Sequence, residues 1–544
     1  MRKYVLGLSV ILIATLACMI WPSSAYAWGP RSMRSITAMA LQVVKHDFPN
    51  TFRPSGIVGP NFERDVMLGA SDGWQVIADR TPLNNDDEVI QAIAAEILLL
   101  REVRLYGPTS YFAYRMGVLA SLTAHAMLPY GFVWTQEEMS LRRAIIADIE
   151  ADIDNYSFSV AQKNRAFIRN AVDYFRKRRS FHSEDKRLIA HDYQVGVNYN
   201  GMMRQAGRAY FVRAVETVAD VWNTVLRGDI STAEFGLSKP SPRTLTWYFL
   251  DEMEFLLTVK DNMHQVEKVY DNFEKVNPRM ASAYERLGDI FYDHDREPVR
   301  LRGVAEWQKA YTLGSTERSG IGRKISAHYL AEGRGYLENA TRPGAEETDL
   351  NNALYAFERA LEYNRMCEDA AALIQDTHVA IRQRNERLEV TLNIIATGER
   401  IFEEAVRYRD GRDFANAIST YRQAVGFFEA VDDEFRDQAN TAREQIRRLR
   451  REIADVINDV VDAASNAIDE GDRARERRQY DEAINHYQRV PGIVAVIPGD
   501  ESATVVRDKN ELIELSRRKI EEASVEKLRY EEAQQEQAQA QAQP

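Results

Sequence analysis

The segment Ala-Ile-Ser-Thr-Tyr-Arg-Gln-Ala at residues 417–424 places an aromatic residue four positions after one alanine and three positions before another. The same spacing occurs in Ala-Leu-Tyr-Ala-Phe-Glu-Arg-Ala at 353–360 and Ala-Ile-Asn-His-Tyr-Gln-Arg-Val at 483–490, and a weaker copy is formed by Gly303, Trp307 and Ala310. Residues three and four apart share one face of an α-helix, so each copy predicts a helix that packs through this face. A small residue allows a neighbouring helix to approach, and the ring fills the space beside it. The copies therefore predict stacked helices.

The remainder of the chain also has helical periodicity. Residues 87–104 form a strongly apolar segment with an acidic start, which suits a helix N-terminus. Further helices are expected near 110–128, 135–152, 160–178 and 200–227. Alternating runs of β-branched residues are nearly absent, so a sheet is not expected. The sequence predicts an all-α fold.

The first 27 residues have the order of a secretory leader. Arg2 and Lys3 precede an apolar run, and small residues end the segment at Ala25-Tyr26-Ala27. This order predicts export, with Trp28 as the first mature residue, in the periplasm or outside the cell. A membrane anchor and a lipoprotein cut before Cys18 are the alternatives. No second segment is long and apolar enough to predict a transmembrane helix in the mature chain.

Charge and cysteine content limit the possible functions. The formal net charge is -12, which disfavours general binding to nucleic acid. The only cysteines are Cys18 and Cys367, so a chain without its leader has no intrachain disulfide and its fold depends on packing.

Composition suggests where domains begin and end. Gly236, Pro240 and Pro242 mark a change to a more highly charged sequence. We expect a leader at 1–27, a helical domain at 28–235 and a connection at 236–279. Helical repeats are expected at 280–500 and a charged helix with a Gln/Ala tail at 501–544. The tail from Glu531 onward is expected to be a disordered segment or a fraying helix.

The small–aromatic–small pattern resembles tetratricopeptide repeats, which are helical hairpins that stack into protein-binding arrays. The resemblance covers roughly residues 280–490. Tandem tetratricopeptides recur about every 34 residues, whereas these copies are 50, 64 and 66 residues apart, so long or extra helices are expected between them. A generic coiled coil or helical bundle is the alternative. The resemblance implies a protein partner, and self-association through residues 380–480 is a further possibility.

The sequence Trp28-Gly29-Pro30 after a leader resembles the bacterial zinc-dependent phospholipase C family and its single-strand nuclease relatives. The segments 56–61 and 117–129 are similar to two further motifs of that family, a Gly-Pro-Asp turn and a helix with His and Asp. The resemblance implies an all-helical domain over about 28–235. It also implies zinc ions, held partly by the amine and carbonyl of the N-terminal tryptophan, that activate water for phosphodiester hydrolysis.

The expected ligands of this family are mostly replaced. Met33 stands where nuclease relatives have histidine, Asn61 where they have aspartate, and Ser121 then His125 where they have His then Asp. Thioether, amide and hydroxyl groups are poor ligands for a hydrolytic zinc ion. We therefore expect a retained fold without cofactor.

A reduced zinc site is the alternative, and its candidate ligands are Trp28, His125, His182 and His191. His125 is equally well explained as a buried histidine with a backbone partner. Four acidic residues alternate at Asp148, Glu150, Asp152 and Asp154, but the glycine of a calcium loop is missing, so we expect a solvated acidic helix face.

These features favour a function in binding. The sequence predicts an exported binding or scaffold protein of the cell envelope, with a non-catalytic hydrolase-like domain and protein-binding repeats. A zinc-dependent phosphodiesterase, such as a phospholipase C, is the second hypothesis, and a self-associating structural protein is the third.

Overall fold

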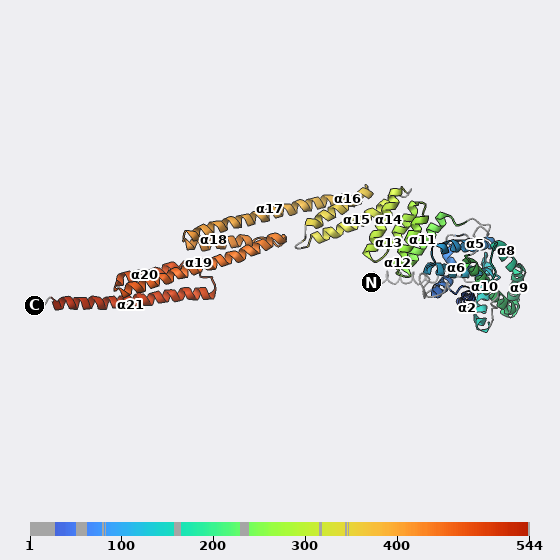
Figure 1. The fold of residues 1–544 in the computed structure, drawn as a ribbon, viewed down its shortest axis with the longest axis horizontal. Coiled ribbons are helices and arrows are strands. Elements are labelled where there is room, and N and C mark those ends of the chain that lie inside the picture. Colours follow the sequence, from blue (N-terminus) through green and yellow to red (C-terminus); the bar gives the residue numbers. More distant parts are fainter. Residues whose placement is uncertain are drawn as a thin grey trace, which may run out of the picture. The chain divides into compact units, whose positions relative to one another are not determined.

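The computed structural model describes residues 28–49, 62–78, 81, 83–156, 165–228, 239–314, 318–342, 345 and 347–541. Over these ranges the chain forms helices and no strand, which confirms the predicted all-α fold (Figure 1). The predicted leader and the segment 56–61, including Asn61, lie outside the described residues.

The chain divides into two compact units, Met1–Ile321 (Unit 1) and Gly322–Pro544 (Unit 2). This division falls later than the composition change at 236–243. The physical reason is that helix α11 (Pro242–Thr258) packs against the earlier helices. Thr109, which precedes helix α6 (Ser110–Ala126), donates a buried hydrogen bond to Glu252 of α11. Lys260 forms an ion pair with the fully buried Asp65 of helix α3 (Phe62–Asp72).

Unit 1 has further helices besides α3, α6 and α11. They are α2 Pro30–Asp47, α4 Gln75–Ala78, α5 Asp86–Val103, η1 Arg104–Tyr106, α7 Gln136–Asp152, η2 Ile153–Asn155, α8 Ala171–Arg178, α9 His182–Gln194, η3 Asn198–Asn200, α10 Met202–Leu226, α12 Met263–Val276, α13 Ala281–Tyr292 and α14 Glu297–Leu313.

The helix expected over 160–178 is not continuous, because among the described residues 165–178 only α8 is helical. Residues 165–170 are extended or bent, and residues 157–164 lie outside the described residues. The backbone amide of Ile168 donates to Thr224 and that of Ala166 to Asp220, both on α10. These tertiary hydrogen bonds replace the helical ones.

Helix α6 is the centre of Unit 1, and every residue from Tyr111 to Ala126 is buried. Its closest neighbour is α3, because Gly69 and Gly117 allow the two backbones to meet. A Cβ on Gly117 would lie 2.0 Å from the carbonyl oxygen of Val66. Two buried indoles fix other helices to α6, since Trp28 Nε1 donates to the Ala124 carbonyl and Trp222 Nε1 to the Met116 carbonyl.

Unit 2 alternates long and short helices (Figure 1). Its helices are α15 Arg318–Ala340, which begins just before the division, α16 Glu347–Tyr363, α17 Glu368–Asp410, α18 Phe414–Glu429, α19 Arg436–Glu476, α20 Tyr480–Val494 and α21 Ala503–Gln541. Each of the long helices α17 and α19 packs against the short helix on either side of it. At a rise of 1.5 Å per residue, each is a rod of roughly 60 Å. The Gln/Ala tail remains helical as far as Gln541.

The small–aromatic–small triads lie on α14, α16, α18 and α20, and their members are buried. In two hairpins of Unit 2 the aromatic ring covers a glycine of the preceding helix, namely Phe357 over Gly333 and Tyr487 over Gly471. The residues between the triads form α17 and α19, which accounts for the 64- and 66-residue spacings.

Two turns of Unit 2 have the same conformation 66 residues apart. Arg412 joins α17 to α18 and Arg478 joins α19 to α20, with φ of 60° and 66°. In both turns the next amide donates to the carbonyl five residues before it, at 2.9 and 3.0 Å. The two hairpins are therefore structural copies of one another at this turn.

Candidate functional site

Trp28, the first predicted ligand, is fully buried against α6 and α10. Its indole donates to the Ala124 carbonyl at 2.8 Å, and its ring meets Phe211 edge-on with centroids 6.0 Å apart. The side chain therefore serves as a packing anchor beside the C-terminal end of α6.

His125, the second predicted ligand, is fully buried at the C-terminal end of α6. Its Nδ1 lies 2.6 Å from the Ser121 carbonyl oxygen, so Nδ1–H donates to the backbone one turn earlier. Burial and the nearby Arg142 lower the pKa of His125 to about 3, although the hydrogen bond to Ser121 opposes this shift. The imidazole is therefore neutral at physiological pH.

His182 lies at the start of α9 and is also buried. Its Nδ1 accepts a hydrogen bond from Arg179 Nε at 3.2 Å. Burial, together with Arg179, Arg213 and Lys186, lowers its pKa to about 3, and a hydrogen bond with the Met127 backbone opposes this shift. This bond places His182 near the end of α6, in the same region as His125.

His191, the fourth, is not brought to this region. It lies nine residues after His182 on the same helix, which at 100° per residue is the opposite face, and it is exposed. Trp28, His125 and His182 therefore gather around the end of α6 without His191.

The described residues do not fit a zinc site in this region. Cations flank both buried histidines, with Arg142 near His125 and three basic side chains near His182. No group of three or more His, Cys, Asp or Glu side chains converges within the described part of the chain. A divalent ion needs anionic or neutral ligands and disfavours neighbouring cations, so the side chains around His125 and His182 do not supply a zinc site.

One carboxylate does stand beside the expected mature N-terminus, and the sequence reasoning misassigned it. Glu150 of α7 accepts hydrogen bonds from the backbone amides of Ser32 at 2.8 Å and Arg31 at 3.1 Å. It thereby caps the N-terminus of α2, where a negative charge is favourable. A Cβ on Gly29 would lie 2.3 Å from this side chain.

The expected solvated acidic face is only partly solvated, because Asp154 is exposed while the other three acids are half-buried and hydrogen-bonded. Asp148 accepts from the Tyr193 hydroxyl and Asp152 from that of Tyr199, both at 2.7 Å. Asp154 pairs with Arg31. The acids of α7 therefore link it to its neighbours: Glu150 to the N-terminus of α2, Asp148 to α9 and Asp152 to η3.

Unit 1 contains a cleft of about 1020 Å³ that no sequence motif predicted. Its lining includes the three alanines, Leu98 and Leu99 of α5, Val76 and Ile77 of α4, and residues 170–173 at the start of α8. It is completed by residues 239–244 and by Trp247, Tyr248 and Asp251 of α11.

A buried ion pair, itself part of the lining, joins two walls of the cleft. Arg115 of α6 donates through Nε and Nη2 to both carboxylate oxygens of Glu96, at 2.9 and 2.7 Å, and through Nη1 to the Tyr111 hydroxyl at 3.2 Å. Its guanidinium lies 5.8 Å and 6.0 Å from the ring centroids of Tyr111 and Tyr248. Burial alone would lower the pKa of Arg115, but Glu96 and Tyr111 hold it well above its usual value.

The available sequence signal for this pair was a charged residue inside each of two otherwise apolar helices. Glu96 interrupts α5 and Arg115 interrupts α6. Buried charges of this kind are retained only when they are paired.

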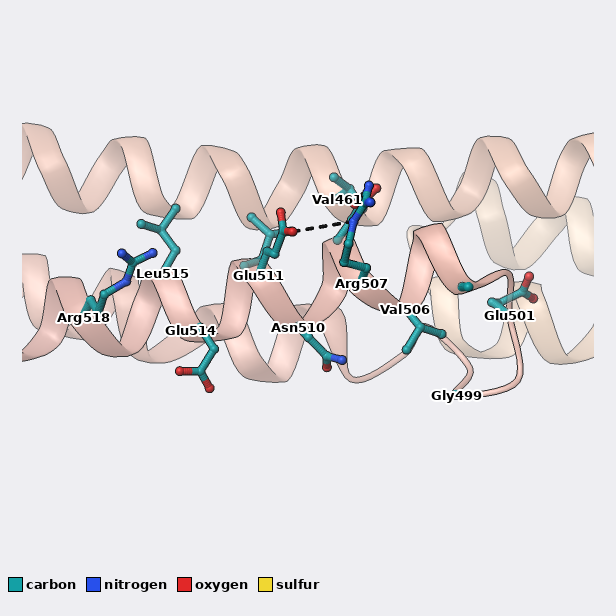
Figure 2. Close-up of a pocket in the computed structure, with 13 residues that line it drawn as sticks. Val461, Gly499, Glu501, Val506, Arg507, Asn510, Glu511, Glu514, Leu515 and Arg518 are labelled. Atoms are coloured by element: carbon teal, nitrogen blue, oxygen red, sulfur yellow. Dashed lines mark hydrogen bonds and ion pairs between the residues drawn. The ribbon is translucent and has the colours of Figure 1, made fainter.

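Unit 2 contains a groove of about 1090 Å³ between the middle of α19 and the first half of α21. Figure 2 shows Arg507 and Glu511 of α21 beside Val461 of α19, joined by an ion pair of 3.6 Å. The apolar lining is Val461, Ala503, Val506, Leu512 and Leu515; the charged lining is Glu501, Arg507, Asp508, Glu511, Glu514 and Arg518. The groove is therefore amphipathic, with four acidic and two basic side chains.

Charge is distributed unequally between the units. Residues 322–544 hold 44 acidic and 32 basic side chains, whereas residues 1–321 hold 38 of each. The whole net charge of -12 therefore belongs to Unit 2.

Among the described residues, no helix combines the length and apolarity needed to cross a membrane. No protein-family model matches the chain, and no curated protein matches it in sequence.

Proposed function

We propose that this chain is an exported binding protein of the cell envelope, in which Unit 2 binds a protein partner that presents a basic surface. In this proposal the helices around Trp28 are a non-catalytic relative of zinc-dependent hydrolases. The observation that carries the proposal is the amphipathic groove between α19 and α21, which lies in the unit that holds all the net negative charge.

The groove supplies two kinds of contact. Val461, Leu512 and Leu515 offer aliphatic surface for a hydrophobic anchor. The lining holds four carboxylates, each paired with an arginine, against two guanidinium groups. This acidic excess favours a partner with lysine or arginine, because complementary charge accelerates encounter and selects partners. Such a partner is expected to bind more weakly at high salt.

The hairpins of Unit 2 support a resemblance to tetratricopeptide repeats. A ring packs over a glycine of the preceding helix in the α15–α16 and α19–α20 hairpins. Stacked hairpins of this type build extended surfaces whose stability does not depend on the side chains exposed along them. That property suits a scaffold for protein binding.

The surroundings of His125 and His182 support the non-catalytic part of the proposal. Both imidazoles are buried, neutral and flanked by cations, and one ring nitrogen of each is occupied by a hydrogen bond. A neutral imidazole with one nitrogen hydrogen-bonded can still bind a metal, so it is the neighbouring cations that disfavour zinc at either ring.

Photo-crosslinking within the producing cells tests the binding function. A benzophenone amino acid is placed at Asn510, an exposed position of the groove, and at Gln534, an exposed position of α21 outside it. We expect one discrete protein adduct from position 510 and none from position 534.

A charge-reversal pair tests whether the groove itself is responsible. Glu511→Lys with Glu514→Lys should abolish the adduct, whereas the same charge change at Glu531 and Glu532, outside the groove, should leave it. Equal adducts from positions 510 and 534, or an adduct that survives reversal in the groove, would contradict the proposal.

Export is tested separately by intact mass. We expect the chain recovered from the envelope or medium to begin at Trp28. A recovered chain that keeps residues 1–27 would exclude the predicted cleavage.

A further inference from the structure

The cleft of Unit 1 has the walls of a small-molecule site. Its volume of about 1020 Å³ is enough for a ligand of several hundred daltons. Ala92, Leu98 and Leu99 of α5 and the Trp247 ring of α11 supply most of the apolar lining. A wall of this composition favours hydrocarbon or aromatic groups.

A buried polar atom of the lining lacks a protein partner. Tyr248 is 2% exposed, and within the described part of the chain its hydroxyl makes no hydrogen bond. A buried hydroxyl without a partner loses its hydration without a compensating hydrogen bond, and a bound acceptor would supply that bond. Arg115, beside the same ring, uses three of its five N–H donors on Glu96 and Tyr111.

The charges around the cleft cancel. Among the described residues, its lining holds three acidic and three basic side chains, namely Glu96, Asp173, Asp251, Arg115, Lys239 and Arg243. Glu96 and Arg115 neutralise one another through two hydrogen bonds, so neither is left to bind an ion. The lining therefore gives no net attraction to an anionic or a cationic ligand.

We propose that this cleft binds an uncharged, largely apolar small molecule, and that the Tyr248 hydroxyl donates a hydrogen bond to a carbonyl oxygen of that molecule. Arg115 offers a second donor to the same acceptor, and Glu96 holds its guanidinium in place. The site lies within Unit 1 and is independent of the partner proposed for Unit 2.

Nile red is a suitable probe because it is uncharged, apolar and bears a carbonyl, and its emission shifts in apolar surroundings. We expect the full chain to bind it saturably with one site. Ala95→Trp places a ring at an exposed lining position of α5 and should abolish binding, whereas Ala147→Trp, at an exposed position of α7 outside the lining, should not.

Tyr248→Phe separates binding from folding. It removes only the hydroxyl, so the thermal midpoint should stay the same or rise, while the affinity for the probe should fall about fivefold, the equivalent of one ordinary hydrogen bond. If the hydroxyl had only a structural role, Tyr248→Phe would lower the thermal midpoint and leave the affinity for the probe unchanged.

Competition tests the ligand class. N-octylacetamide should displace Nile red at lower concentration than octanoate or octylammonium, which have similar chains but carry charge. The proposal is overturned if Ala95→Trp binds the probe like the unmodified chain, if Tyr248→Phe leaves affinity unchanged, or if either ion competes as well as the amide.

Discussion

Arg412 and Arg478 occupy the same place in two turns 66 residues apart, and both adopt the left-handed conformation that glycine prefers. A non-glycine residue in this region costs about 1 kcal/mol. Each turn therefore requires a backbone with positive φ and does not require the arginine side chain.

This relationship predicts a contrast between two substitutions. Arg412→Gly should leave the free energy of unfolding unchanged or raise it, whereas Arg412→Val should lower it by about 1–2 kcal/mol because β-branching disfavours positive φ. Urea denaturation followed by far-ultraviolet circular dichroism measures both. Equal midpoints for the glycine and valine variants would show that the turn relaxes.

The contact between Gly69 and Gly117 predicts intolerance of any side chain. In Gly117→Ala the new Cβ would need to move about an ångström or more from the Val66 carbonyl, so Unit 1 should lose roughly 3 kcal/mol. All seven tryptophans lie at or before Trp307, so tryptophan fluorescence reports on Unit 1 alone.

Gly335→Ala is the control for that substitution, and because Gly335 lies in Unit 2 its stability is read by far-ultraviolet circular dichroism rather than by tryptophan fluorescence. A Cβ there meets nothing within 4 Å, and the residue lies inside α15, so alanine should stabilise the chain by about 1 kcal/mol. A Gly117→Ala variant as stable as Gly335→Ala would contradict the close approach of α3 and α6.

His182 predicts a loss of stability in mild acid. Its pKa is about 3 in the folded chain against 6.5 for an ordinary histidine. Below pH 6.5 the unfolded chain binds a proton that the folded chain does not, so the stability present above pH 6.5 is lost between pH 6.5 and 3.

His182→Gln should remove this dependence. Relative to the variant, the unmodified chain should lose roughly 1 kcal/mol per pH unit below pH 6. Urea titrations at pH 7 and pH 5, read by tryptophan fluorescence, give the difference. Parallel pH profiles for the two proteins would mean that His182 is protonated in the folded chain.

Glu252 predicts the opposite slope. Burial raises its pKa to about 8, although the hydrogen bond from Thr109 opposes the shift, whereas the ordinary value is 4.5. Between these values the folded chain binds the extra proton, so stability falls as pH rises from 4.5 to 8. Glu252→Gln should abolish this fall, of roughly 1 kcal/mol per pH unit, and a slope retained in the variant would assign it elsewhere.

Metal analysis and metal removal distinguish a non-catalytic hydrolase-like domain from a zinc-dependent phosphodiesterase. We expect the purified chain beginning at Trp28 to carry well under one zinc per molecule, and a chelator to leave its thermal midpoint unchanged. Stoichiometric zinc that is lost when one residue is added before Trp28 would instead support the phosphodiesterase, as would chelator-sensitive hydrolysis of phosphatidylcholine or single-stranded DNA.

Periodicity was sufficient to predict the helices that carry the triads, because their buried faces follow one geometric rule. The triad centred on Tyr421 and its counterpart centred on Tyr487 are buried as their spacing predicts. Periodicity carries no information about which distant residue meets a helix end, and so the role of Glu150 as the cap of α2 was missed.

The cleft was beyond sequence reasoning for a related reason. Glu96 and Arg115 are 19 positions apart on different helices, and only the packing of α5 against α6 makes them a pair. His125 and His182 were candidate ligands by sequence, but Arg142 beside His125 and Arg213 beside His182 come from other helices, which no local motif connects to the histidines.

The long helices of Unit 2 have a mechanical consequence. Since α19 belongs both to the contact with α18 and to the contact with α20, no flexible joint separates the two hairpins. Tension applied along this rod passes from one hairpin to the next through backbone hydrogen bonds rather than through a loop. A load on one end of Unit 2 is thus shared by neighbouring hairpins.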